Sequence, residues 1–294
     1  MWSTIAQHIA EVTETSCAVQ LVKPVAGGCI NSAYRLKGGN KDYFVKVNAS
    51  AGPAMFEAEA VGLQELSDTN TVKVPRPICW GQVKGSVYLV LEYWPLKPIT
   101  AEGLVSLGGQ LAALHRIAQP HFGWHRNNTI GATPQYNTPS QNWLEFWRQH
   151  RLGFQLQLAA TKGYGGALQR KGERLMAQAG ALFVGYTPTA CLLHGDLWGG
   201  NVASNTAGDP LMFDPATYYG DRETDIAMTE LFGGFGPDFY TAYHAVYPLP
   251  DGYQVRRIFY NLYHILNHLN LFGGSYLAQA ERLMEQVLLA IRRH

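Results

Sequence analysis

Two stretches decide the fold of this chain: Leu192-Leu193-His194-Gly195-Asp196-Leu197-Trp198-Gly199-Gly200-Asn201 and, shortly after it, Leu211-Met212-Phe213-Asp214. In each of them an apolar run typical of a buried strand leads directly to polar side chains. Asp196 and Asn201 are five positions apart, the spacing found in the catalytic loop of kinases. Phosphate transfer from a nucleotide needs a carboxylate near the acceptor hydroxyl, then an amide oxygen and a second carboxylate for Mg²⁺. The stretches supply these groups in that order, although Asp and Asn are also common in ordinary polar turns.

A third stretch, Asp42-Tyr43-Phe44-Val45-Lys46-Val47, is typical of an apolar strand that carries one lysine. Such a lysine can reach the phosphates of a nucleotide when a carboxylate on the next helix orients it. That helix offers Glu57 and Glu59, which lie on different faces, and spacing alone does not decide between them. A strand lysine that faces solvent is the ordinary explanation, and only the combination with the Asp196 loop favours a functional one.

The segment between the first two predicted strands is rich in small residues, Ala26-Gly27-Gly28-Cys29-Ile30-Asn31-Ser32. Small residues let backbone N–H groups approach phosphates, but the segment matches neither common glycine-rich phosphate motif. A plain hairpin turn explains it equally well, and its position one strand before Lys46 favours phosphate binding. The Cys29 thiol would lie near a cation, which lowers a thiol pKa, so we consider redox control; the alternative is a small apolar turn residue.

A fourth stretch places several acids just before an apolar helix: Gly220-Asp221-Arg222-Glu223-Thr224-Asp225-Ile226-Ala227-Met228. Acids at the start of a helix interact favourably with its dipole, so capping is one explanation. The functional alternatives are a brace for the catalytic loop or contact with a substrate, and we assign Asp221 and Glu223 to the substrate.

The coarse organisation is a strand-rich first third followed by helices. We expect strands at 18–25, 32–37, 42–47, 75–83 and 86–91 with one helix at 53–66, in the order β-β-β-α-β-β. Pro95 and Pro98 indicate a hinge. Beyond it we expect helices near 104–118, 143–160, 166–183, 223–231, 253–271 and 275–293, and a small strand patch at 190–193, 202–205 and 211–213.

Composition excludes several classes of function. The chain has 294 residues, 47% of them hydrophobic and 15% charged, with a net charge of +1. Near-neutral charge without a Lys/Arg run speaks against nucleic acid and anionic membranes as partners. The four cysteines form no C-x-x-C pair, which argues against a zinc site or a disulfide framework. Without a recognisable signal peptide or membrane-spanning run, we expect a cytoplasmic protein.

With these residues in view, the chain resembles the ketosamine-3-kinases, or fructosamine kinase family, relatives of aminoglycoside and choline kinases. The resemblance extends over nearly the whole chain. Its motifs are Gly27-Gly28-Cys29-Ile30-Asn31, Phe44-Val45-Lys46, Phe56-Glu57-Ala58-Glu59-Ala60, His194 to Asn201, Phe213-Asp214-Pro215-Ala216, and two stretches specific to the family, 127–135 and 220–228. It implies an α+β, bilobal, protein-kinase-like fold. The N-terminal lobe, residues 1–92, would contain an antiparallel sheet and one helix; a hinge at about 92–98 would lead to a larger, mainly helical lobe, residues 93–294.

The resemblance also implies the roles of individual residues. Asp196 would be the catalytic base, Asn201 and Asp214 the Mg²⁺ ligands, and Trp198 a sugar contact, although core packing also explains a tryptophan. The residues implied to bind ATP are Gly27, Gly28, Asn31, Ser32, Lys46, its partner Glu59, and the hinge residues Glu92, Tyr93 and Trp94. The implied reaction is ATP-dependent phosphorylation of the 3-hydroxyl of a ketosamine, free or attached to a protein, whose unstable product releases the amine in protein deglycation.

Two departures and several alternatives accompany this resemblance. Tyr136 stands where the family pattern leads us to expect proline, and no activation-loop signature of protein kinases follows Asp214. An aminoglycoside- or choline-type kinase is the alternative activity. A kinase fold that serves only as a binding module would have lost at least one of the catalytic residues, but all four are present: Lys46, Asp196, Asn201 and Asp214. The chain is expected to be a monomer or a homodimer, and a disulfide between subunits through Cys29 is a possibility within the family.

Overall fold

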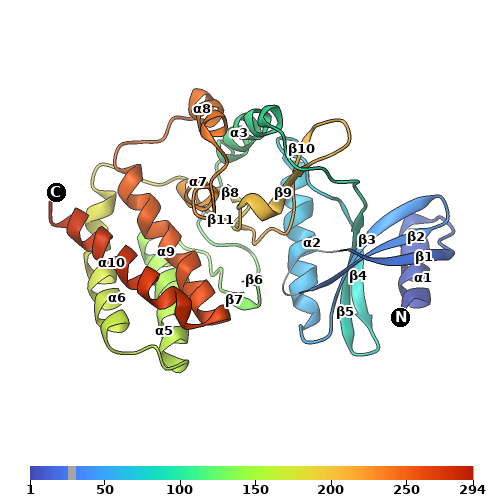
Figure 1. The fold of residues 1–294 in the computed structure, drawn as a ribbon, viewed down its shortest axis with the longest axis horizontal. Coiled ribbons are helices and arrows are strands. Elements are labelled where there is room, and N and C mark those ends of the chain that lie inside the picture. The colour runs from blue at the N-terminus through green and yellow to red at the C-terminus, as the bar shows by residue number, and fades with distance from the viewer. Residues whose placement is uncertain (26–30, 294) are drawn as a thin grey trace. The chain divides into compact units, whose positions relative to one another are not determined.

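The computed structural model describes residues 1–25 and 31–293, which form two compact units (Figure 1). The first unit contains Met1–Gly103 and Asn201–Pro215; the second contains Leu104–Gly200 and the residues from Ala216 onward. The first unit thus extends past the predicted hinge and includes a segment from the second half of the chain. The predicted lobe boundary at residues 92–98 stays a prediction. Gly27, Gly28 and Cys29 lie outside the described residues.

The first unit is built on a five-stranded antiparallel sheet with the strand order β1-β2-β3-β5-β4. Successive side chains of β3 point to opposite faces of the sheet, and both faces are covered by a helix. Tyr43, Val45 and Val47 pack in one core with Ile5 and Ile9 of α1, while Lys46, which lies between Val45 and Val47, contacts Glu59 of α2. Figure 1 shows α2 beside the sheet. The elements are α1 (Trp2–Thr13), β1 (Val19–Val25), β2 (Ser32–Gly38), β3 (Lys41–Asn48), α2 (Pro53–Asp68), β4 (Pro77–Val83) and β5 (Ser86–Glu92).

The later segment of the first unit is a short hairpin of β9 (Val202–Ser204) and β10 (Pro210–Met212), preceded by a 3₁₀ turn at Gly199–Asn201. Backbone hydrogen bonds join it to the earlier residues, from Met212 to Lys73 at 3.0 Å and between Lys97 and Ser204 at 2.8 and 2.9 Å. These bonds fix the position of the residues that follow β10, including Asp214, within the first unit.

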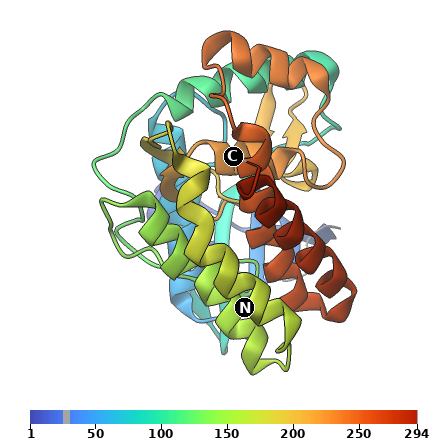
Figure 2. The ribbon, with the colours of Figure 1, turned by 90° about the vertical axis from the view of Figure 1, so that its left-hand side faces the viewer.

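The second unit is mainly helical. Helix α9 (Tyr253–Phe272) is its central element, since most of its residues are buried against α5, α7 and α10. Figures 1 and 2 show α5 and α6 beside α9 and α10. The other elements are α3 (Ala101–His115), β6 (Asn128–Ile130), β7 (Thr133–Gln135), α4 (Trp143–Trp147), α5 (Phe154–Thr161), α6 (Ala167–Gln178), 3₁₀ turns at Ala179–Phe183 and Gly274–Tyr276, β8 (Ala190–Leu193), β11 (Tyr218–Asp221), α7 (Glu223–Thr229), α8 (Pro237–Val246) and α10 (Leu277–Ile291).

The α+β class predicted from the sequence is confirmed, and the structure adds elements that the sequence did not predict. Helices α1 and α8 and the strands β6, β7 and β11 were not expected. The helix expected at 143–160 is interrupted by a π-helical segment, Arg148–Gly153. This wider turn changes which side chains face the core. Arg151 is fully buried there and donates to the carbonyl of Tyr136 and the amide oxygen of Asn137 at 2.7 and 2.8 Å.

Across the described ranges, 1–25 and 31–293, no helix combines the length and the apolar character needed to cross a membrane.

Candidate active site

The first group of predicted site residues surrounds Lys46 in the first unit. Lys46 is near the end of β3 and is only 4% exposed. Its Nζ atom lies 2.5 Å from Oε1 of Glu59 on α2 and 2.6 Å from Oδ1 of Asp214. Burial alone would lower the pKa of Lys46, but the charges of Asp214 and Glu59 outweigh it and raise that pKa. The lysine is therefore a stable cation held between two carboxylates.

Asn201 and Asp214, the predicted Mg²⁺ ligands, are neighbours in the first unit. The N–H of Phe213 donates to the carbonyl of Asn201 at 3.1 Å, so the two ends of the β9–β10 hairpin meet. Asn201 is buried, whereas the Asp214 side chain is 43% exposed. The backbone of Asp214 has a φ of 57°, a left-handed conformation that Asp adopts more readily than most residues. A carboxylate and an amide oxygen are the hard oxygen donors that Mg²⁺ prefers, so this pair fits the ion chemically.

The predicted catalytic loop begins where β8 ends, in the second unit. His194 and Gly195 are buried, but Asp196 is partly exposed and Trp198 is 38% exposed. The backbone of Gly195 has a φ of 82°, and a Cβ atom there would lie 2.1 Å from the carbonyl oxygen of Ala216. Only glycine fits this turn. The turn takes the chain from the buried strand β8, which ends at Leu193, to the partly exposed Asp196 within three residues.

Asp225 on α7 holds the catalytic loop through its backbone. Its carboxylate accepts hydrogen bonds from the N–H groups of His194 at 2.7 Å and Gly195 at 2.8 Å. Burial alone would raise the pKa of Asp225, but the hydrogen bonds and charges that face it, above all from His115, keep that pKa below its ordinary value. The ionised carboxylate therefore binds the two peptide groups that directly precede Asp196.

The stretch at residues 127–135, which the family resemblance singled out, stabilises a neighbouring segment of the second unit. It forms the hairpin of β6 and β7. The side chain of Asn128 donates to the carbonyl of Thr217 at 2.8 Å, and that of Gln135 donates to the carbonyl of Ala216 at 3.0 Å. The N–H of Ala216 in turn donates to the carbonyl of His194 at 2.9 Å. The hairpin thus fixes the backbone that pairs with the start of the catalytic loop.

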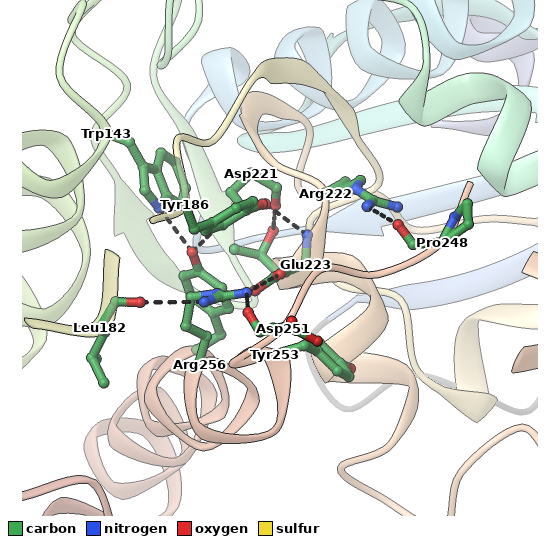
Figure 3. A network of polar contacts seen from close by, with 12 residues as sticks. Trp143, Leu182, Tyr186, Asp221, Arg222, Glu223, Pro248, Asp251, Tyr253 and Arg256 are labelled. Atoms are coloured by element: carbon green, nitrogen blue, oxygen red, sulfur yellow. Dashed lines mark hydrogen bonds and ion pairs between the residues drawn. The ribbon is translucent and has the colours of Figure 1, made fainter. Parts of the chain in front are cut away.

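Asp221 and Glu223 belong to a buried network in the second unit (Figure 3). Asp221 accepts hydrogen bonds from the hydroxyls of Tyr260 at 2.5 Å and Tyr186 at 2.8 Å. Glu223 forms a bidentate ion pair with Arg256, with N–O distances of 2.7 and 2.8 Å. Neither acid is exposed to solvent.

This network argues against a substrate contact by Asp221 and Glu223, and that assignment stays a prediction. Both carboxylates are buried and bonded to side chains of the second unit itself. Burial raises the pKa of both acids, that of Glu223 to about 7, although the ion pair with Arg256 opposes the shift. Two desolvated acids near one arginine account for these shifts.

The remaining predicted nucleotide-binding residues lie at strand ends in the first unit. Asn31 precedes β2, and its side-chain oxygen accepts a hydrogen bond from Asn48 at 2.8 Å, while Ser32 is the exposed first residue of β2. The predicted hinge residues come at and after the end of β5: Glu92, Tyr93 and Trp94. All three are partly exposed. Their roles toward a nucleotide stay predictions.

Two residues that organise the second unit, Arg256 and Tyr260, match no catalytic motif and were not predicted. Asp225 lies in the stretch 220–228, for which a brace of the catalytic loop was one of the predicted roles. Its burial could also be expected, because Ile226 and Ala227 follow it in an apolar helix and a charged residue in such a run is usually buried and paired. Arg256 and Tyr260 are four residues apart on α9, a spacing that places them on one face.

Comparison with known proteins identifies relatives along the whole chain. The sequence model of the fructosamine kinase family matches residues 1–290. A probable ketoamine kinase of Synechocystis is 47% identical over 98% of this chain and 97% of its own length. The chloroplastic protein-ribulosamine 3-kinase of rice is 42% identical over 91% of this chain and 78% of its own length.

Solved structures agree with the sequence relatives. The crystal structure of a putative fructosamine-3-kinase from Haemophilus somnus superposes with a TM-score of 0.90 at 29% identity, and covers 98% of both chains. An aminoglycoside phosphotransferase superposes with a TM-score of 0.63 at 14% identity, with 97% of this chain and 98% of that chain covered, and this likeness shows the kinase-like fold alone. Matching sequence and matching structure over nearly the full length place this chain in the fructosamine kinase family.

Proposed function

We propose that this chain phosphorylates the 3-hydroxyl of a ketosamine with ATP as the phosphate donor. The observation that carries the proposal is the cluster of Lys46, Glu59 and Asp214, in which a buried cation is held by two carboxylates and one of these is open to solvent. A kinase needs such a cation for phosphate and such a carboxylate for a metal ion. Family membership supports the class of enzyme, and the names of the bacterial and rice relatives support a ketosamine as the acceptor.

In this proposal each group has one task. Lys46 binds phosphate oxygens and is oriented by Glu59, while Asn201 and Asp214 would hold Mg²⁺. When bound, the ion would neutralise charge that develops on the phosphates during transfer. Asp196 accepts the proton of the sugar hydroxyl. At the same time the hydroxyl oxygen of the sugar forms a bond to the γ-phosphorus of ATP, and the bond from that phosphorus to the leaving ADP oxygen breaks.

Trp198 extends the proposal to the substrate side. It is exposed two residues after Asp196, where an aromatic face can pack against a sugar ring. The proposal covers ketosamines carried by a free amine or by a protein side chain. In both, the phosphorylated sugar would release the amine.

The test is an ATP-consumption assay of the purified protein against ribulose-lysine, fructose-lysine, an aminoglycoside and choline. We expect turnover on at least one ketosamine, with mass spectrometry showing one added phosphate. Turnover on the antibiotic or choline alone would overturn the substrate assignment.

The Asp196→Ala variant is the control for the role of the base. It should lose about 10²–10⁴-fold in kcat because general-base catalysis contributes roughly that much. Its ATP affinity, measured by calorimetry, should stay close to that of the parent, since the base acts on the acceptor. A folded variant that loses nucleotide binding to the same extent would contradict this role.

A further inference from the structure

A strip of aromatic side chains in the second unit begins at the predicted catalytic loop and continues to the end of α9. Its members are Trp198, Phe232, His268, Phe272 and Tyr276. The centroids of rings in contact lie 5.0–6.5 Å apart, with Phe232 joining Trp198 to His268 and the last two rings both in contact with His268. We call these five residues the aromatic strip.

The aromatic strip is open to solvent although its rings are largely apolar. Five aromatic side chains are exposed among residues 1–25 and 31–293, and three of them belong to the strip: Trp198 at 38%, Phe232 at 39% and Phe272 at 54%. Single exposed apolar residues are common on protein surfaces, whereas adjoining ones mark a binding surface. Burial lowers the pKa of His268, so its ring is neutral near pH 7. The strip therefore suits an uncharged, partly apolar partner.

The strip starts where the proposed function places the sugar. Trp198 follows the proposed base, Asp196, by two residues. A Cβ atom at Gly200 would lie 2.3 Å from the Trp198 ring, so the ring lies directly against the loop backbone. Phe232 meets the same ring edge-on, with an interplanar angle of 78°. These two contacts hold the Trp198 ring in place, and the other rings continue the surface from there.

The strip is longer than a sugar on a free amine can cover. A lysine side chain spans about 6 Å from its nitrogen to its Cα atom, about one step between neighbouring rings. With a sugar on Trp198, such a stem would extend over Phe232 toward His268. The peptide residues on either side of that lysine would then come next to Phe272 and Tyr276, which a free ketosamine would leave uncovered.

We propose that Phe272 and Tyr276 bind the peptide segment around a lysine that carries the ketosamine, so that this chain acts on protein-attached ketosamines in preference to free ones. The inference rests on the proposed function, which places the sugar at Trp198. Phe272 and Tyr276 select the substrate and take no part in the transfer of phosphate. Apolar peptide residues beside the lysine lose contact with water against these rings, which favours binding.

The first experiment compares two substrates that carry the same sugar, the one that the ATP-consumption assay ranks first. One is the free ketosamine of lysine, and the other is a peptide with that ketosamine on a lysine between two leucines. We expect Phe272→Ala to lower kcat/KM for the peptide about 5- to 30-fold, mainly through KM, and to leave kcat/KM for the free ketosamine within about twofold. Phe272→Tyr keeps the ring and should keep the parental values. Equal loss on both substrates, or loss on neither, would overturn the proposal.

The matched control is Trp80→Ala. Trp80 on β4 is 38% exposed, as Trp198 is, but it belongs to the first unit and is not a member of the aromatic strip. It should leave kcat/KM for both substrates close to the parental values. A loss on the peptide as large as that in Phe272→Ala would assign the effect to exposed rings in general and overturn the proposal. If Phe272→Ala does not fold, Tyr276→Ala replaces it, since Tyr276 lies in the 3₁₀ turn after α9.

A second experiment separates this inference from the proposed function. Calorimetry without ATP measures how tightly the parent and Phe272→Ala bind the ketosamine peptide. We expect Kd to be about 5- to 30-fold higher in the variant. That difference in a protein that phosphorylates no ketosamine would support the peptide-binding role and reject the proposed function. Equal Kd values, or no binding, would reject the peptide-binding role whatever the activity.

Discussion

Two clusters in this molecule combine a cation with two carboxylates, and they differ in access to solvent. In the first unit Lys46 lies between Glu59 and Asp214. In the second unit Arg256 binds Glu223, and the carboxylate of Asp221 is next to them. The Asp214 side chain is 43% exposed, whereas neither acid of the second cluster is exposed at all.

The difference teaches how one combination of charges serves two purposes. Every oxygen of the Asp221 and Glu223 carboxylates has a partner within the protein, so this cluster stabilises the fold. The exposed carboxylate of Asp214 is open to solvent, and in the proposed function it exchanges its contact with Lys46 for a metal ion. A half-exposed member therefore distinguishes the cluster proposed to act on substrate from the cluster that is structural. Removing the cation from each cluster in turn tests this distinction.

The largest effect is expected from Arg256→Met. The change leaves Glu223 buried without its counter-ion, and breaking a buried ion pair costs about 3–5 kcal/mol in the free energy of unfolding. Urea denaturation measures this loss. The matched control is Arg257→Met at the neighbouring residue, which pairs with Glu230 near the surface and should cost at most about 1 kcal/mol. Equal costs in the two variants would contradict a structural role for the buried cluster.

A smaller effect, on activity, is expected from Lys46→Met. A hydrogen bond to a charged group contributes about 1.5–3 kcal/mol, so loss of the phosphate contact should lower kcat/KM about 10- to 150-fold. Its cost in unfolding free energy should be below that of Arg256→Met, because water can solvate Asp214, whose side chain is 43% exposed, whereas both acids beside Arg256 are buried. Activity assays and urea denaturation on the same samples measure whether Lys46→Met loses activity more than stability. Full activity in a destabilised variant would reverse the roles assigned to the two clusters.

The smallest effect is a pH dependence of stability that arises from Glu223. Its pKa is about 7 in the folded chain and rises from an ordinary value of 4.5, because burial disfavours the charged form. The folded state therefore holds a proton that the unfolded state releases at lower pH. Its contribution to stability is complete below about pH 4.5 and is lost as the pH rises through about 7.

Glu223→Gln should remove this dependence. We expect the unfolding free energy of the parent, relative to the variant, to fall between pH 5 and pH 8 by on the order of 1 kcal/mol. The comparison uses the slope of unfolding free energy against pH and not its absolute value, because the variant also loses the ion pair with Arg256 at every pH. Parallel curves for the two proteins over this range would refute the assignment.

Much of the fold could be predicted from the sequence because it follows from local patterns. Alternating strands, the helix at 53–66 and the apolar run before His194 are visible in single windows of sequence. The structure places Lys46 against Glu59, a choice that helical spacing had left open between Glu57 and Glu59. The choice depends on which face of α2 meets the sheet, and no window of sequence contains that information.

The roles of Asp221 and Glu223 show why the rest could not be predicted. Acids at the start of a helix have the same sequence pattern whether they cap the helix, contact a ligand or are buried. Their partners Tyr186, Tyr260 and Arg256 are distant in sequence and come together only through packing of the second unit. Helix α1 was missed although its apolar residues Trp2, Ile5, Ile9 and Val12 recur at helical spacing; the sheet that buries Ile5 and Ile9 comes later in the chain.

The assignment of residues Asn201–Pro215 to the first unit has a consequence for protein synthesis. A ribosome makes the chain from the N-terminus, so the five strands of the sheet leave it long before β9 and β10 exist. During that interval Lys46 can pair with Glu59 but not with Asp214. The carbonyl of Lys73 also lacks the hydrogen bond that it later accepts from the N–H of Met212. The first unit to be translated is thus completed only after nearly three quarters of the chain, up to Pro215 of 294 residues, has been made. A nascent chain stalled before residue 201 should therefore be more sensitive to protease in its N-terminal segment than one stalled beyond residue 215.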